Sequence, residues 1–297
     1  MLRFTKMHGA GNDFVFLDGL TEPQLAARGD LPALAAAMCD RRKGVGADGL
    51  IVICAAEPSM QADVRMKMFN IDGSESAMCG NGLRCLAKYV LERGLARQRR
   101  DGKLMVQTDS GVVEAACRRA GAGCVESVTV DMGRPMLDLP RVPVDRSKLA
   151  GGAGPAYALS VDGARYEAVF VSMGNPHAAI YVDDVAGCDL PAVGPRLERH
   201  PAFPQRMNVH FVQVAGPGEV VMRTWERGSG ITGACGSGAC AVCVAGVLTG
   251  RTQRRVLTHQ PGGDLTLHWD QSSGHVFMTG PAVEVFSGQW RQADGAG

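Results

Sequence analysis

Residues 69–85 read FNIDGSESAMCGNGLRC, and residues 225–241 read WERGSGITGACGSGACA. In both stretches a strand-like segment and a polar loop lead to the motif Cys-Gly-x-Gly, at which a helical pattern begins. The motif cysteines, Cys79 and Cys235, lie 156 positions apart, close to half of the 297 residues. This spacing predicts that the chain consists of two copies of one structural unit.

Two further repeats support the duplication. Nine residues before each motif cysteine stands a polar residue at a strand end, Asn70 in one stretch and Glu226 in the other. Near the N-terminus, Gly11-Asn12-Asp13 is echoed later in the chain by Gly174-Asn175-Pro176. We therefore expect two halves of similar fold. The expected halves comprise residues 1–125 with 283–297, and residues 126–282.

Many short strands and three helices are predicted around these motifs. Helical periodicity predicts helices over Leu31–Arg42, with Asp30 as the N-cap, and over Asn81–Arg93 and Ser237–Leu248. The third helix is apolar on every side, which predicts a buried central helix. Alternation of apolar and polar residues predicts eight strands. They are Val64–Phe69, Leu104–Thr108, Val128–Met132, Tyr166–Val171, Asn208–Val214, Val220–Trp225, Asp264–Trp269 and His275–Thr279.

The composition is that of a globular protein with small-molecule partners. The formal net charge is +1, and no dense basic run occurs beyond Arg97–Arg100, so nucleic-acid binding is not expected. The longest nearly unbroken apolar run, Ala239–Leu248, has ten residues, about half of the roughly 20 that cross a bilayer. The N-terminus lacks an apolar signal segment. We therefore expect a cytoplasmic protein without a membrane partner, whose ten cysteines are reduced.

A cysteine at the start of a helix is suited to acid–base chemistry. Unpaired backbone N–H groups and the positive end of the helix dipole lower a thiol pKa from about 8.5 toward neutrality. The glycines of Cys-Gly-x-Gly let a bound carboxylate approach those N–H groups. Two such helix starts facing one substrate would place a thiolate on one side of a carbon acid and a thiol on the other, which inverts the carbon without a cofactor.

Four segments carry a resemblance to a known family. They are MHGAGNDFVFLD (7–18), FNIDGSESAMCGNGLRC (69–85), SMGNPHAAIYVDD (172–184) and WERGSGITGACGSGACA (225–241). In order and across nearly the whole chain, they resemble diaminopimelate epimerase. The resemblance implies an α/β (α+β) fold of two pseudo-symmetric domains, each a mixed β-sheet wrapped around a central helix, with the active site in the cleft between them. It also implies conversion of LL-2,6-diaminopimelate to meso-diaminopimelate without pyridoxal phosphate or metal, in lysine and peptidoglycan precursor synthesis, by a homodimer.

The resemblance assigns site residues position by position. It makes Cys79 and Cys235 the catalytic thiols, which His177 and Glu226 tune. The carboxylate at the reacting centre is expected at Gly80, Asn81, Gly236 and Ser237. The rest of the substrate is expected at Asn12, Asn70, Asn175, Asn208, Glu226 and Arg227. Some family members carry glutamine where this chain has Gly49, so no substrate contact is expected from that side chain.

Three alternatives stay open. A racemase of the same fold could act on proline, hydroxyproline or histidine. A thiol redox protein would use Cys240 and Cys243, whose spacing suits redox or metal chemistry but which lie in the apolar helix. A non-catalytic module would bind an amino acid without exchanging its α-proton. The eight cysteines outside the two motifs are expected to be inert packing residues.

Overall fold

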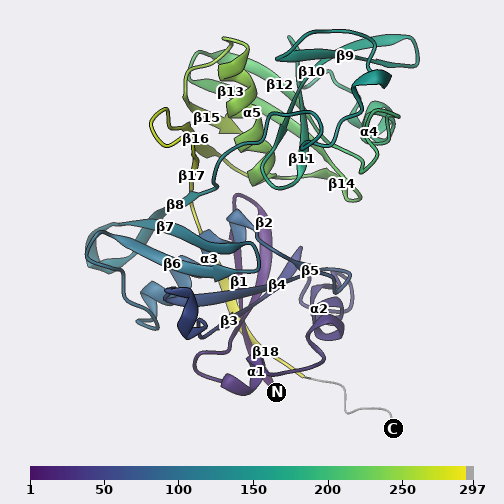
Figure 1. Ribbon diagram of the computed structural model, residues 1–297. Helices are drawn as coiled ribbons and strands as arrows, with labels where there is room; N and C mark the ends of the chain where they lie inside the picture. The colour runs from purple at the N-terminus through teal and green to yellow at the C-terminus, as the bar shows by residue number, and fades with distance from the viewer. Residues whose placement is uncertain (292–297) are drawn as a thin grey trace. The chain divides into compact units, whose positions relative to one another are not determined.

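The structure is a computed structural model that describes residues 1–291, without the side chain of Ala122. The chain forms two compact units (Figure 1). Unit 1 comprises Met1–Val130 and the chain from Gly280 on, and unit 2 comprises Asp131–Thr279. No helix within residues 1–291 is long and apolar enough to span a membrane.

Unit 1 contains a mixed sheet in the strand order β18-β1-β2-β3-β4-β6-β7-β8. Two neighbouring pairs, β2–β3 and β4–β6, are parallel, and the other neighbours are antiparallel. The short strand β5 (Glu75–Ser76) pairs with the end of β4. The other strands are β1 (Leu2–Gly9), β2 (Asn12–Asp18), β3 (Gly49–Cys54), β4 (Val64–Asn70), β6 (Lys103–Thr108), β7 (Gly111–Arg119), β8 (Val125–Asp131) and β18 (Val283–Trp290).

Unit 2 contains a mixed sheet in the order β9-β10-β11-β12-β13-β15-β16-β17. Its parallel pairs are β11–β12 and β13–β15, and the short strand β14 (Gly230–Thr232) pairs with β13. The strands are β9 (Ala156–Val161), β10 (Ala164–Ser172), β11 (Pro176–Tyr181), β12 (Asn208–Gly216), β13 (Glu219–Glu226), β15 (Arg255–His259), β16 (Leu265–Trp269) and β17 (Val276–Gly280).

The two sheets follow one plan. Strands β1 to β8 correspond in order to β10 to β17, with the same two parallel pairs, and β18 takes the edge position in unit 1 that β9 takes in unit 2. The duplication predicted from the paired cysteine motifs is thus present in the topology. All eight predicted strands are also present, with ends that differ by at most a few residues.

A helix lies at the centre of each unit. In unit 1, α3 (Gly80–Glu92) packs against β1, β2 and β7, and in unit 2, α5 (Gly236–Leu248) packs against β10, β11, β12, β15 and β16. Because these strands come from both halves of the sheet order, each sheet curves around its helix (Figure 1). Residues on all sides of α5 are buried, from Gly238 to Gly246. The predicted α+β fold with a mixed sheet around a central helix is confirmed.

Further helices cover the other face of each sheet. In unit 1 these are α1 (Pro23–Ala26) and α2 (Leu31–Cys39), and in unit 2 the equivalent is α4 (Leu190–Glu198). Neither α1 nor α4 was predicted. The α2 helix begins at Asp30 as predicted, but the Asp30 carboxylate accepts a hydrogen bond from Arg28 Nε at 2.8 Å instead of capping the helix. Short 3₁₀ turns occur at Pro58–Met60, Gly121–Gly123 and Arg146–Lys148.

The core therefore lies on both faces of each sheet. On β2, Val15 and Leu17 pack in the cluster that contains α2, whereas the Phe16 ring stacks on Tyr89 of α3 with ring centroids 6.0 Å apart. Every residue of β3 is buried.

Candidate active site

Each unit carries a group of polar residues at the start of its central helix. Half-site 1 surrounds Cys79 in unit 1, and half-site 2 surrounds Cys235 in unit 2. Both cysteines are N-cap residues with extended backbone, at φ −141° and ψ 114° for Cys79 and φ −129° and ψ 104° for Cys235. The predicted position of both thiols at a helix N-terminus is therefore correct.

Cys79 is a half-buried thiol in contact with hydrogen-bonding groups. Its Sγ accepts a hydrogen bond from the Gly82 N–H at 3.5 Å, and the thiol donates to Asn12 Oδ1 at 3.8 Å. A backbone N–H directed at sulfur favours the thiolate, as does the positive end of the α3 dipole. The N–H group and the helix start favour the thiolate, whereas Asn12 Oδ1 accepts a hydrogen bond from the thiol form.

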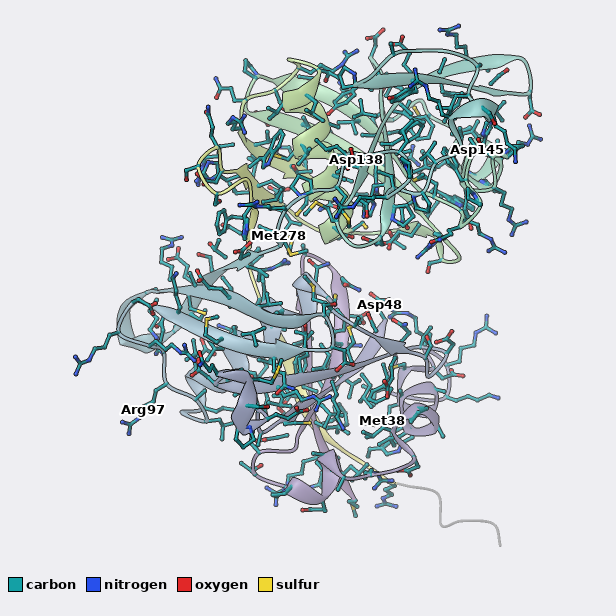
Figure 2. All side chains as sticks on the ribbon, in the orientation of Figure 1. Met38, Asp48, Arg97, Asp138, Asp145 and Met278 are labelled. Atoms are coloured by element: carbon teal, nitrogen blue, oxygen red, sulfur yellow. The ribbon has the colours of Figure 1, made fainter. Side chains whose placement is uncertain are left out.

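A chain of amides holds Asn12 beside this thiol. Asn81 Nδ2 donates to Asn12 Oδ1 at 3.2 Å, and Asn12 Nδ2 donates to Asp48 Oδ2 at 2.6 Å. Arg84 Nη1 in turn donates to Asn81 Oδ1 at 2.9 Å. The structure brings together three predicted residues, Cys79, Asn12 and Asn81. Asp48 (labelled in Figure 2) and Arg84 were not predicted. Arg84 lies within the quoted segment 69–85, and Asp48 directly precedes Gly49.

Asn70 and Gly49 face each other across β4 and β3. Asn70 Nδ2 donates to Ser74 Oγ at 2.9 Å, which holds the side chain at the turn after β4. At Gly49 an added Cβ would lie 2.7 Å from the carbonyl oxygen of Phe69. A side chain at this position would therefore require the neighbouring backbone to shift.

Cys235 lies in a more enclosed environment. It is 5% exposed, its N–H donates to Gln260 Oε1 at 2.8 Å, and its Sγ lies 3.8 Å from Ser237 Oγ. Burial raises the pKa of Cys235 well above its ordinary value, and the negative charge of Glu226 raises it further. Hydrogen bonds from the Gly238 N–H and the Ser237 hydroxyl oppose this rise. Cys235 therefore rests as a thiol. Gln260 had no motif in the sequence that could reveal it.

Glu226, Arg227 and Asn208 meet at the end of β13. The Glu226 carboxylate accepts a hydrogen bond from the Thr232 hydroxyl. Asn208 Oδ1 accepts from the Arg227 N–H at 2.9 Å, while Asn208 Nδ2 donates to the carbonyl of Pro176 at 2.8 Å. The buried Asn208 side chain thus joins two loop ends. The exposed Arg227 side chain donates from Nη1 to the backbone carbonyl of Gln205 at 3.0 Å.

His177 is fully buried behind half-site 2. Its Nδ1 lies 2.9 Å from His210 Nε2, and its Nε2 lies 2.8 Å from Asn175 Oδ1. Burial, followed by the charges of His210 and Arg227, holds the pKa of His177 well below its usual range. His177 is therefore neutral and can act on the thiol only as a polar group. His210 was not predicted, because it lies in a strand outside the quoted motifs.

Three potential metal ligands occur together in half-site 2. Donor atoms of His177, His210 and Cys235 lie within 4.8 Å of one another. Two of the ring nitrogens are already joined directly, at the 2.9 Å distance of a hydrogen bond. They therefore face each other, whereas a metal ion needs donor atoms that face a common point.

A family model described as diaminopimelate epimerase matches residues 4–137 and 169–285. The matched ranges cover most of the chain and contain both half-sites. The chain belongs to the diaminopimelate epimerase family. The family predicted from the four motifs is confirmed, and with it the prediction that the protein is an isomerase.

Curated relatives in this family align over nearly their whole length. The diaminopimelate epimerase of Moorella thermoacetica is 48% identical over 291 residues, which cover 97% of this chain and 99% of the relative. The diaminopimelate epimerase of Heliobacterium modesticaldum is 47% identical over 290 residues, which cover 97% and 99%. This family member is therefore similar to complete epimerase chains.

Solved structures of more distant proteins share the fold. A hydroxyproline epimerase from Agrobacterium vitis superposes with a TM-score of 0.67 at 16% identity, covering 97% of this chain and 91% of the other. A probable proline racemase from Agrobacterium radiobacter gives 0.70 at 14% identity, covering 99% and 94%. At such low identity the likeness concerns the fold alone.

The remaining cysteines of this epimerase-family chain are mostly packing residues. Five are fully buried, among them Cys240 and Cys243, and burial raises the pKa of Cys243 to about 12. Neither is exposed as a redox pair must be, which disfavours that alternative. Cys124 is the exception. It is exposed directly before β8, with Sγ 3.7 Å from Lys88 Nζ, so the expectation that it packs in the interior is wrong.

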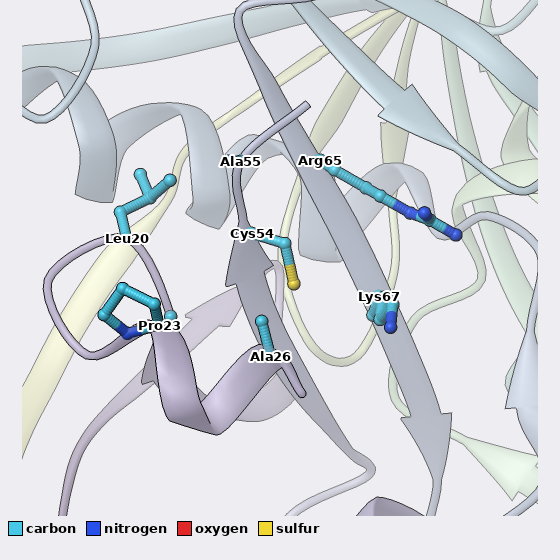
Figure 3. Close-up of a pocket in the computed structure, with 8 residues that line it drawn as sticks. Leu20, Pro23, Ala26, Cys54, Ala55, Arg65 and Lys67 are labelled. Carbon is cyan, nitrogen blue, oxygen red and sulfur yellow. The ribbon is translucent and has the colours of Figure 1, made fainter. Parts of the chain in front are cut away.

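Two hollows of unit 1 lie away from the cysteines. One, of about 300 Å³, lies beside α1 (Figure 3). It is lined by Gly19, Leu20, Pro23, Ala26, Cys54, Ala55, Arg65 and Lys67. The other, of about 410 Å³, lies beside β18 and includes Thr5, Tyr89 and Ser287 in its lining. Neither is lined by Cys79 or by any of the amides held near it.

Proposed function

We propose that this member of the diaminopimelate epimerase family interconverts LL- and meso-diaminopimelate by moving protons between Cys79, Cys235 and the substrate α-carbon. The observation that carries the proposal is the repetition of one arrangement, a cysteine at the N-cap of the central helix, in both units. Two units with one thiol each supply the two bases that inversion requires. We take these units as the two epimerase halves expected from the sequence.

The two thiols differ in a way that supports distinct resting states. Cys79 is half-buried, whereas Cys235 is 5% exposed, and burial and Glu226 raise the pKa of Cys235. We therefore assign Cys79 as the thiolate and Cys235 as the thiol. The thiolate takes the α-proton while the C–H electron pair moves into the substrate carboxylate. The α-carbon then takes the proton of the thiol from the opposite face, which leaves the two sulfurs with exchanged protonation.

The helix starts also suit the substrate carboxylate at the reacting centre. The first N–H groups of a helix have no partner within the helix. In the proposed complex these groups, at Gly80-Asn81 and Gly236-Ser237, bind the carboxylate and stabilise the charge that develops on it. No pyridoxal phosphate or metal is required for this route, because the thiols and N–H groups supply the base, the acid and the anion binding.

The far end of diaminopimelate carries a second ammonium and a second carboxylate. The exposed guanidinium of Arg227 suits the carboxylate, and the Glu226 carboxylate suits the ammonium. Asn12, Asn70, Asn175 and Asn208 complete the proposed substrate site. Their hydrogen bonds to neighbouring groups support fixed orientations of these amides.

We also propose a cellular location and an oligomeric state for the enzyme. Thiols stay reduced in the cytoplasm, which supports the cytoplasmic location expected from the sequence. The exposed edge strand β18 supports the expected homodimer. Three of its apolar side chains are at least 40% exposed, Val283, Val285 and Phe286. The product would then enter lysine and peptidoglycan precursor synthesis.

Exchange of the α-proton tests the proposal directly. The protein is incubated with LL-diaminopimelate in D₂O under reducing conditions with no added cofactor, and deuterium at the α-carbon is followed together with the meso isomer. We expect both to appear, and both to be lost after thiol alkylation. The same assay with proline, hydroxyproline and histidine tests the other racemases. Exchange with one of these but not with diaminopimelate would overturn the substrate assignment, and binding without exchange would indicate a non-catalytic module.

A further inference from the structure

A chain of hydrogen bonds crosses unit 2 behind half-site 2. Thr224 Oγ1 lies 3.0 Å from His210 Nδ1, on the neighbouring strand. The other nitrogen of that ring meets His177, and His177 meets Asn175. Thr224 is 3% exposed and both rings are fully buried, whereas Asn175 at the end of the chain is half-buried. The chain thus connects the sheet interior to a proposed substrate residue.

The fold itself does not need these polar groups. Sheet register shows which residues of unit 1 occupy the corresponding places. They are Phe14, Ile51 and Met68, all of which are apolar and buried. The same plan is therefore stable with an apolar column in one unit, and the polar column is specific to the unit that contains Cys235. Buried polar groups cost free energy unless paired, so a function beyond packing is indicated.

The direction of the hydrogen bonds follows from the donors and acceptors at the two ends. An amide oxygen only accepts, so His177 Nε2 carries a proton and donates to Asn175 Oδ1. Burial lowers the pKa of His210 to about 3 and that of His177 well below its usual value, so each ring carries a single proton. His177 Nδ1 therefore accepts from His210 Nε2–H, and His210 Nδ1 accepts from the Thr224 hydroxyl.

The opposite direction of the hydrogen bonds is disfavoured at Thr224. In that direction His210 would donate to Thr224 Oγ1, and the hydroxyl proton would need another acceptor. Within residues 1–291 the Thr224 hydroxyl makes no other hydrogen bond. A buried donor without an acceptor is costly. One direction of the hydrogen bonds therefore prevails, and in it Asn175 Oδ1 accepts from His177. Asn175 Nδ2 makes no hydrogen bond to the described part of the chain, so it is the end of the amide that can bind a ligand.

We propose that Thr224 and His210 are positioning residues that act through His177 to hold the Asn175 amide with its nitrogen toward the substrate. Asn175 then offers N–H donors and no acceptor, so it selects a carboxylate of the substrate and disfavours an ammonium group. This role rests on the proposed function and adds to it the chemical group that Asn175 binds. Neither Thr224 nor His210 contacts the substrate in this proposal.

Substitutions at Thr224 test whether its hydroxyl determines the direction of the hydrogen bonds. Thr224→Val keeps the shape but removes the hydroxyl proton, so His210 Nδ1 is unsatisfied in either direction of the hydrogen bonds and the preference between the two directions falls. We expect KM for diaminopimelate to rise about fivefold or more with kcat changed much less, because loss of a buried hydrogen bond affects substrate positioning. Thr224→Ser keeps the donor and is expected to retain the wild-type KM. An unchanged KM in Thr224→Val would overturn the proposal.

A second pair of variants keeps the test valid if Thr224→Val does not fold. His210→Gln places an amide N–H where the ring donated to His177, whereas His210→Met has similar length and no donor. We expect the glutamine variant to keep a KM close to that of the wild type and the methionine variant to show the larger rise. Equal effects of the two substitutions would assign His210 a packing role only.

The protonation of the rings is a readout that does not depend on the substrate. Long-range ¹H–¹⁵N NMR near neutral pH separates protonated from unprotonated ring nitrogens. In the wild type both His177 and His210 should carry the proton at Nε2, and Thr224→Val should show a mixture for His210. A proton at Nδ1 of either ring in the wild type would overturn the proposal. If the NMR result is as expected but the wild type does not act on diaminopimelate, the proposed function has failed and the direction of the hydrogen bonds stands.

Discussion

Cys79 and Cys235 occupy the same place at a helix start, but they differ in burial and in their neighbours. Cys79 is half-buried at the start of α3, and in the proposed mechanism it is the thiolate. A thiol that is 5% exposed and near a carboxylate is held as the neutral acid. The helix dipole alone would make the two sulfurs alike, so the difference arises from burial and from Glu226.

Replacing either cysteine by serine separates the two half-reactions. Cys79→Ser and Cys235→Ser should each lower epimerisation about 10³-fold or more, because serine is a poor acid and base near neutral pH. Each variant should still exchange the α-proton of the isomer whose proton faces the remaining thiol, as measured by deuterium uptake from each isomer separately. Cys124→Ser, at an exposed cysteine outside both half-sites, serves as the control. Normal turnover in either active-site variant would refute the two-thiol mechanism.

The second glycine of each Cys-Gly-x-Gly motif determines how closely the helix approaches the strand beneath it. An added Cβ at Gly82 would lie 2.6 Å from Ile51 Cδ1, the end of a flexible side chain. At Gly238 it would lie 2.3 Å from His210 Cε1 and 3.0 Å from Cys235 Sγ. The His210 ring is held by hydrogen bonds on both sides, so it cannot move away as Ile51 can.

Alanine substitutions at these two glycines should therefore differ in cost. Gly238→Ala is expected to lower the free energy of unfolding by about 2–3 kcal/mol, and Gly82→Ala by about 1 kcal/mol or less, because alanine also gains helix propensity. Urea denaturation measures both values. Gly29→Ala, at a position with no atom within 4 Å of the added Cβ, is the control. Equal costs at the two motif glycines would contradict a rigid His210.

Some strands and helices were predictable because one face is more buried and more apolar than the other. Strands such as β13 alternate buried and partly exposed residues, and α3 has an apolar stripe, so periodicity reveals them. By contrast β3 is buried throughout and β11 nearly so, because helices cover both faces of these sheets. Their sequences are apolar runs without alternation. Strands of this kind are hard to separate from loops or helices by pattern alone.

At the scale of the whole molecule, the C-terminal strand completes the sheet of the first unit. Strand β18 pairs antiparallel with β1 on one side, while its apolar residues remain exposed. An exposed apolar edge strand promotes association with another chain. The position of β18 therefore supports the proposed homodimer.

A charge placed on this strand tests the dimer. Val285 is 55% exposed, and Val285→Lys would put an ammonium group into the proposed contact. We expect sedimentation analysis to show a shift from dimer to monomer at micromolar concentration, because a buried unpaired charge is costly. Val112→Lys, at an exposed valine of β7 in the same unit, is the matched control and should remain dimeric. A wild-type monomer, or a dimer in both variants, would argue against this contact.

The sequence by itself determined the duplication, the two cysteines at helix starts, the α+β class and the family. These features depend on local spacing and on motif strings, which are visible along the chain. It also indicated Asn12 and Asn81, because both lie inside a motif. The contact between them, and the contact of Asn12 with Cys79, came only with the fold.

Only the tertiary structure decided how the two thiols differ and what surrounds them. His210, Thr224 and Gln260 lie on strands or loops far along the chain from the groups they contact, and their residue types carry no motif. Burial is likewise a property of the packed unit, and it controls the pKa of Cys235 and of both histidines. Electrostatics in a folded protein depends on distance and desolvation in space, and neither can be read from the order of residues.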